Sequence, residues 1–324
     1  MRNVASRIKF SLTISNRGPL VYGVSVSDLL SLAEVADESE VFDAVMVGDS
    51  LLTKPRLESV TMLAAIAART HRVRLGVACL SSFPLRNPIL LADQWATLDQ
   101  ISDGRTIMVA CIGGSSGRIK GEEEFRAFDR SINDRVSLLR EGVEILRRLW
   151  SEDSVTYHGK FNHLEGVHLE PKPIQKSPPI WIAVRPPSAD AAGATYRRLA
   201  KLSDGWMSIR LRPEEVQGGW QEIQRYCHEL RRDVPVCAVY ANLCLDDSRE
   251  RALRESKEYL DKYYYADFSW EIIESWGAYG SRADCIRVIE GYRDAGVNFI
   301  TFRPTGPNVQ DQVRRWVRDL LPSF

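Results

Sequence analysis

Eight short apolar runs, separated by longer amphipathic stretches, are the feature that most constrains the fold of this chain. This alternation is typical of repeated strand–helix units, whose parallel strands are buried on both faces. Eight is also the number of strands that closes a parallel barrel. The sequence therefore predicts an α/β fold, a (β/α)8 TIM barrel. The expected strands are Ile8–Ile14, Ala44–Val47, Val73–Ala78, Thr106–Ala110, Ile180–Ala183, Gly205–Ser208, Val236–Asn242 and Phe299–Phe302.

The stretches between these runs carry apolar residues at helical spacing. Ser25 or Ser27 can cap the first helix, and Pro88 occupies the first turn of the third, where its missing N–H costs nothing. The last helix ends at Pro322. The expected helices are Val26–Glu40, Glu58–Arg69, Pro88–Ile101, Arg135–Trp150 and Val309–Leu321.

Two stretches, one after strand four and one after strand seven, interrupt the rhythm and are interpreted as insertions. Val155–Pro179 is polar and rich in proline, which predicts a hairpin around Gly159 followed by an extended segment. Arg249–Tyr279 is rich in tyrosine and tryptophan. Its aromatic side chains fit a lid or substrate wall, or a packed subunit interface, and the sequence leaves both open.

Length and charge limit the function classes. A barrel can use all 324 residues, so residues 1–324 are expected to form one domain. Lys plus Arg and Asp plus Glu both number 43, so no net field favours nucleic acid. No apolar stretch reaches the roughly 18 residues needed to span a bilayer. The six cysteines include no CxxC pair, and the N-terminus has no signal-peptide core, so we expect free thiols and a cytoplasmic location.

Several segments, taken in order, resemble the bacterial luciferase-like family of flavin-dependent oxidoreductases and monooxygenases. They are FDAVMVGDSLLTKPRLESVTMLAAIAARTHRVRLGVACL, LRNPILLADQWATLDQISDGRTIMVACIGG, VHLEPKPIQ, PPIWIA, RLAKLSDGWMS and GYRDAGVNFITF. The similarity covers nearly the whole chain except the aromatic insertion. It implies a luciferase-like barrel that binds reduced FMN or the deazaflavin coenzyme F420 on the loops after its strands.

The leading hypothesis is a monooxygenase that uses reduced FMN and oxygen on a small organic substrate. No GxGxxG fingerprint follows a strand, which favours a separate flavin reductase as partner. The first alternative is an F420-dependent oxidoreductase that transfers a hydride. The second is a non-catalytic partner subunit, and the resemblance also leaves a homodimer open.

The resemblance implies that the flavin ring lies against the end of strand three. There the family has a non-prolyl cis peptide, which would be Ala78–Cys79 or Val77–Ala78 in this sequence. The alternative is that small residues only satisfy barrel packing. Gly113, after strand four, would place loop backbone beside the flavin, although any tight turn can use a glycine. The arginine or glutamate that relatives carry near this point is absent.

The cofactor phosphate is expected at a helix start, where exposed N–H groups bind anions. Alignment with the family, counted back from DGW, places it at four small residues that we expect to open a helix, namely Ala192, Gly193, Ala194 and Thr195. Ser188 is the alternative, and an ordinary helix entry needs no phosphate at all. Arg303, after strand eight, would either add a phosphate contact or form a surface ion pair.

Asp49 and Ser50 end strand two, where relatives have an acidic residue followed by a catalytic histidine. Serine does not titrate near neutral pH and cannot replace an imidazole as acid or base. Asp49, Glu58 or a water must then carry the proton, unless Asp49 is a helix-cap or structural carboxylate. His158, His163 and His168 have the wrong spacing for a metal site and are expected on the surface.

Overall fold

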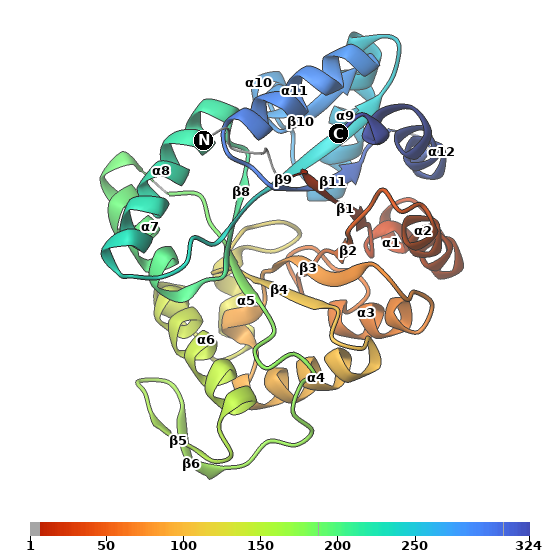
Figure 1. The fold of residues 1–324 in the computed structure, drawn as a ribbon. Coiled ribbons are helices and arrows are strands. Elements are labelled where there is room, and N and C mark those ends of the chain that lie inside the picture. The colour runs from red at the N-terminus through yellow and green to blue at the C-terminus, as the bar shows by residue number, and fades with distance from the viewer. Residues whose placement is uncertain (1–6, 187, 307) are drawn as a thin grey trace. The chain divides into compact units, whose positions relative to one another are not determined.

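A computed structural model describes residues 7–186, 188–306 and 308–324 of the chain (Figure 1). Its main sheet has the strand order β10-β9-β11-β1-β2-β3-β4-β7-β8, and β8 also pairs with β9, so that eight parallel strands close a barrel. The barrel strands are β1 (Lys9–Ile14), β2 (Ala44–Val47), β3 (Arg74–Leu80), β4 (Thr106–Ala110), β7 (Ile180–Ala183), β8 (Gly205–Ile209), β9 (Val236–Leu245) and β11 (Phe299–Pro304). The predicted fold class is confirmed.

Burial explains why the apolar runs located these strands so well. Every residue of β2 and of β4 is buried, as expected for strands covered on both faces. The predicted bounds of β2, β4 and β7 coincide with the observed ones. The other barrel strands differ from the prediction by three residues at most at either end.

Helices follow the strands in the alternation that the sequence predicts. Asn87 caps α4 by accepting hydrogen bonds from the Ile89 and Leu90 N–H groups, and Pro88 stands in its first turn. The helices are α1 (Gly18–Val21), α2 (Val26–Glu38), α3 (Ser59–Ala67), α4 (Pro88–Ile101), α5 (Gly121–Ala127), α6 (Arg135–Ser151), α7 (Ala189–Leu202), α8 (Pro213–Glu229), α9 (Arg249–Tyr264), α10 (Trp270–Ser275), α11 (Arg282–Asp294) and α12 (Val309–Arg315).

The last helix was predicted to continue to Leu321, but regular α-helix ends at Arg315. A π-helical turn, Trp316–Leu320, and a 3-10 turn, Leu321–Ser323, follow it. Pro322 has no N–H to donate to the preceding turn, which accounts for the irregular end.

Both insertions are present after barrel strands four and seven. The first contains the predicted hairpin, formed by antiparallel β5 (Val155–His158) and β6 (His163–Val167). The second contains α9, α10 and the short strand β10 (Gly277–Gly280), which pairs in parallel with β9. The sequence analysis missed β10, because two of its four residues are glycines and glycine disfavours strands.

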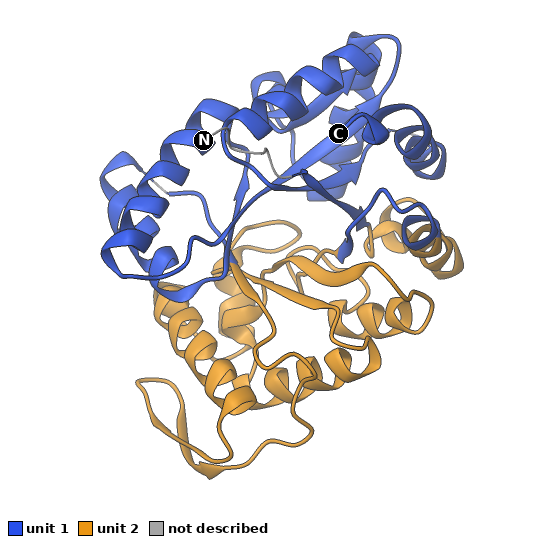
Figure 2. Cartoon of the chain, in the orientation of Figure 1, with its two compact units in different colours: residues 1–14, 35–46, 182–324 blue, residues 15–34, 47–181 orange. Residues whose placement is uncertain are grey.

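The chain divides into two compact units (Figure 2). Unit 1 contains the described residues among 1–14, 35–46 and 182–324, and unit 2 contains 15–34 and 47–181. In unit 1, the Phe302 ring lies 6.1 Å from Phe10 and 6.2 Å from Trp316. In unit 2, α6 packs so closely on Phe83 that a Cβ at Gly142 would lie 2.6 Å from its ring.

Candidate functional site

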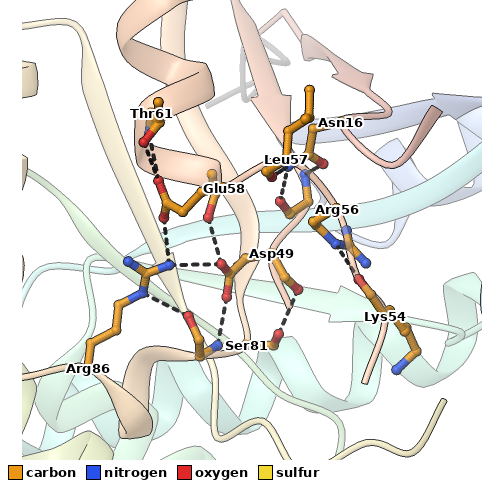
Figure 3. A network of polar contacts seen from close by, with 12 residues as sticks. Asn16, Asp49, Lys54, Arg56, Leu57, Glu58, Thr61, Ser81 and Arg86 are labelled. Carbon is orange, nitrogen blue, oxygen red and sulfur yellow. Dashed lines mark hydrogen bonds and ion pairs between the residues drawn. The ribbon is translucent and has the colours of Figure 1, made fainter. Parts of the chain in front are cut away.

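In unit 2, Asp49 follows β2 and is held by three donors (Figure 3). One carboxylate oxygen accepts from the Ser59 hydroxyl at 2.6 Å and from Arg86 at 3.1 Å, and the other accepts from the Ser82 N–H at 2.7 Å. The Asp49 side chain is only 2% exposed. Arg86 also donates to the Ser82 hydroxyl. These bonds connect the loop after β2 to the loop after β3, which favours the structural alternative for Asp49.

Glu58 also has a structural role, because its carboxylate accepts hydrogen bonds from two groups of the protein. It caps α3 by accepting from the Thr61 N–H at 2.7 Å, and it accepts from Arg86 at 2.8 Å (Figure 3). Partial burial acts to raise the pKa of Glu58, but the Thr61 N–H and the Arg86 guanidinium outweigh it, so the pKa lies below its ordinary value. A carboxylate held in its charged form in this way is a poor proton donor near neutral pH.

Ser50 is buried and its hydroxyl is engaged within its own loop. It lies 2.8 Å from the Thr53 hydroxyl and accepts from the Lys54 N–H at 2.9 Å. The hydroxyl thereby closes a turn after β2, which is common for serine in loops. The geometry gives Ser50 a structural task at the position where relatives have a histidine.

The end of β3 has the cis peptide that the resemblance implied, between Ala78 and Cys79. Cys79 is half-buried, and its sulfur lies 2.7 Å from the sulfur of the buried Cys111. The hydrogen bond with Cys79, together with burial, raises the pKa of Cys111 well above its ordinary value. The sequence analysis did not pair these cysteines, although each closely follows the end of a predicted strand and the two strands are neighbours.

The structure explains why position 113 is a glycine. Its φ is +61°, and a Cβ there would lie 2.3 Å from the carbonyl oxygen of Ser81. Only glycine fits this approach to the loop after β3. Gly113 lies in unit 2, as do Asp49, Ser50, Ala78 and Cys79. Its contact with a flavin stays a prediction.

In unit 1, the expected phosphate-binding residues lie deeper in a helix than predicted. α7 begins at Ala189, with Ser188 as its N-cap, so Ala192, Gly193, Ala194 and Thr195 belong to its second turn. The expectation that they open the helix is wrong, because N–H groups from the fourth helical residue, Ala192, onward bond within the helix. The open N–H groups are those of Ser188–Ala191, and the Ser188 side chain forms no capping hydrogen bond with them.

Two other expectations can be compared with the structure. Arg303 is completely buried, so the surface ion pair proposed for it is wrong. His158, His163 and His168 are exposed, as expected. His158 and His163 nevertheless face each other across the hairpin with ring centroids 6.2 Å apart, because the register pairs them.

Among the described residues, no group of His, Cys, Asp and Glu side chains could hold a metal ion. In the same residues, no helix has both the length and the apolar character needed to cross a membrane.

Comparison with known proteins extends this description. A family model described as luciferase-like monooxygenase matches residues 7–271. F420-dependent glucose-6-phosphate dehydrogenase of Amycolatopsis mediterranei (strain U-32) is 24% identical over 92% of this chain and 94% of its own length. The same-named protein of Nocardia farcinica (strain IFM 10152) is 26% identical over 82% of this chain and 83% of its own.

Solved structures show the same fold. An F420-dependent secondary alcohol dehydrogenase in complex with an F420-acetone adduct aligns with a TM-score of 0.80 at 17% identity, over 96% of this chain and 97% of its own. Monooxygenase RslO1 from Streptomyces bottropensis aligns with a TM-score of 0.79 at 23% identity, over 98% of this chain and 99% of its own.

Proposed function

The chain belongs to the luciferase-like monooxygenase family, an oxidoreductase family, and from this premise we propose that it is an F420-dependent oxidoreductase. It would transfer a hydride between the deazaflavin and a carbon of a small organic substrate. The observation that carries this proposal is the name shared by the curated relatives described above, which align along most of the chain. It gives precedence to the hydride-transfer alternative over the FMN monooxygenase that the sequence analysis placed first.

The residues present fit a flavin-type ring at the end of β3. Ala78 and Cys79 have small side chains, and Gly113 brings glycine backbone to the neighbouring loop. Small side chains leave the backbone open to a flat ligand. Ala78 and Cys79 would hold the ring, and the cofactor would supply the hydride chemistry.

The open first turn of α7 suits the cofactor phosphate. The Ser188 side chain does not cap the N–H groups of Ser188–Ala191, and the helix dipole favours an anion there. Asp190 in this turn opposes a phosphate. Its side chain is exposed, so solvent screens its charge. We therefore move the phosphate prediction from Ala192–Thr195 to Ser188–Ala191.

One observation keeps the FMN monooxygenase as a second candidate. Asp49, Ser50 and Glu58 are all engaged in internal hydrogen bonds, so none of the three is a free proton carrier at the end of β2. Oxidation of an alcohol by hydride transfer requires a base for the hydroxyl proton. Transfer of an oxygen atom from O2 with electrons from a reduced flavin depends more on a dry site than on such a base.

Fluorescence titration of the purified chain with F420, and separately with FMN, tests the proposal. We expect an F420 dissociation constant at least tenfold lower than that of FMN. Tighter binding of FMN, accompanied by oxygen uptake when the flavin is reduced, would instead support the monooxygenase. A separate flavin reductase stays a prediction that belongs to the monooxygenase alternative, and a homodimer stays a prediction under either cofactor.

A further inference from the structure

Unit 1 holds a buried guanidinium inside a group of aromatic rings. Arg303, near the end of β11, has no exposed surface, and its central carbon lies 4.9–5.2 Å from the ring centroids of four aromatic residues, Tyr240, Tyr263, Tyr264 and Trp276. Its Nε donates to the Asn242 side-chain oxygen at 2.9 Å, and its Nη1 donates to the Tyr264 hydroxyl at 2.7 Å. These contacts fix the guanidinium in one orientation. We refer to Arg303, Arg210, Tyr264 and Trp276 as the arginine cage.

A second cation completes the cage. The guanidinium carbon of Arg210, just after β8, lies 4.4 Å from the Trp276 ring and 5.3 Å from the Phe268 ring. Burial lowers the pKa of Arg210; Tyr264 acts to raise it, and the positive charges of Arg303 and Arg185 act to lower it. Two like charges thus share one indole ring, an arrangement that electrostatics disfavours unless an anion balances it.

No such anion is supplied by the described part of the chain. Among residues 7–186, 188–306 and 308–324, no carboxylate forms an ion pair with Arg303 or Arg210. Arg225 on α8 is the opposite case, because it stacks on Tyr226 at 4.2 Å and also pairs with Glu222 and Glu229. The cage arginines have the aromatic contacts without the carboxylates.

Two buried donors in the cage also lack acceptors. Nη2 of Arg303 and Nε1 of Trp276 are both buried, and neither has a hydrogen-bond partner in the described residues. Arginine and tryptophan side chains can only donate, so an acceptor is what the cage lacks. Buried donors are nearly always paired in folded proteins, and each unpaired one needs an explanation.

From these donors and charges we infer that the arginine cage binds an oxyanion, a carboxylate or phosphate group of the substrate. The anion would accept from Nη2 of Arg303 and Nε1 of Trp276 and would balance both guanidinium charges. Arg210 and Tyr264 in the arginine cage, and Phe268 beside Arg210, are half-exposed, so solvent reaches this side of the cage. The assignment to the substrate rests on the proposed oxidoreductase function, whereas the anion binding itself does not.

Calorimetric titration of the full chain, without cofactor, tests the inference and is independent of the F420 titration. The probes are sodium phosphate, sodium benzoate and the neutral analogue benzamide. We expect at least one anion to bind and benzamide to bind at least tenfold more weakly. Phosphate alone would indicate a phosphorylated substrate, and benzoate alone a carboxylic acid.

Variants of two cage residues test whether the anion binds in the arginine cage. Arg210→Gln changes a half-exposed side chain and should weaken anion binding at least tenfold, as should Arg303→Lys, which keeps the charge but loses the Nε and Nη donors. Arg225→Gln is the matched control and should leave the affinity unchanged. Circular dichroism melting confirms that each variant is folded. Failure of both anions to bind, or equal affinity in the wild type, Arg210→Gln and Arg303→Lys, would overturn the inference.

Discussion

Arg86 donates from one nitrogen both to Asp49, at 3.1 Å, and to Glu58, at 2.8 Å (Figure 3). The Arg86 side chain is 13% exposed and that of Asp49 only 2%, so this part of the ion-pair network is poorly screened by water. Through Arg86, both carboxylates help to hold the loops after β2 and β3 in place. This arrangement also makes their contributions to stability measurable.

Replacing Asp49 by Asn should destabilise the protein by roughly 2 kcal/mol, the usual range for a buried charged hydrogen bond whose partner retains another acceptor. Urea unfolding gives the change in free energy. The control is Asp319→Asn, which removes an exposed pair with Arg318 and should leave the unfolding midpoint where it is. A wild-type midpoint for Asp49→Asn would return Asp49 to the catalytic candidates.

The Glu58 contribution should depend on pH. Its folded pKa lies below the ordinary value of 4.5, so the charged form stabilises the folded state. The stabilisation is complete above pH 4.5 and is lost as the pH falls through the lower folded pKa. Urea unfolding at pH 7 and at pH 3.5 gives the free energy of unfolding of the wild type and of Glu58→Gln. The difference in this free energy between the two proteins should be smaller at pH 3.5. An equal difference at both values would contradict this account.

Cys79 and Cys111 should cross-link under oxidation, because their sulfurs touch between neighbouring strands, in which Leu80 pairs with Ala110. Hydrogen peroxide oxidises the thiol of the half-buried Cys79 to a sulfenic acid with release of one water. The Cys111 thiol then displaces a second water from that sulfur to form the disulfide. Peptide mass spectrometry should find a Cys79–Cys111 link.

Two variants serve as controls for this cross-link. Cys79→Ser should abolish it. Cys237→Ser should not affect it, because burial raises the pKa of Cys237 and makes that thiol unreactive. The pairing would be refuted if excess peroxide oxidised other residues of the folded, cofactor-free protein while Cys79 and Cys111 both stayed free thiols.

An acidic residue in the first turn of α7 should compete with the cofactor phosphate. Ala191→Asp places a carboxylate beside the open N–H groups, where it stabilises the helix and repels a phosphate. We expect at least tenfold weaker F420 binding with no loss of thermal stability. Ala194→Asp, on the exposed face of the second turn, is the matched control. The reverse pattern would restore the phosphate to Ala192–Thr195.

The barrel was predictable because its strands are buried on both faces and are therefore continuous apolar runs. Helix starts were harder. The start of α7 was placed by counting back from the DGW motif, although Ser188 followed by Asp190 is itself an N-terminal signal. The strand β10 escaped because its burial against β9, rather than its own residues, makes it a strand.

The site was only partly predictable, for a related reason. Asp49, Ala78, Cys79 and Gly113 were found through a family pattern, but their partners Arg86 and Cys111 are close only after folding. The surroundings of Arg303 come from β9, α9 and the segment before β10, so no local sequence pattern could distinguish a cage from a surface ion pair.

Competition between the two cofactors tests the central claim most directly. The purified chain is dialysed to equilibrium against equal concentrations of F420 and FMN, and the bound fraction of each is measured after the protein is denatured. If the protein is an F420-dependent oxidoreductase, bound F420 will exceed bound FMN at least tenfold. An excess of bound FMN would contradict the proposed function.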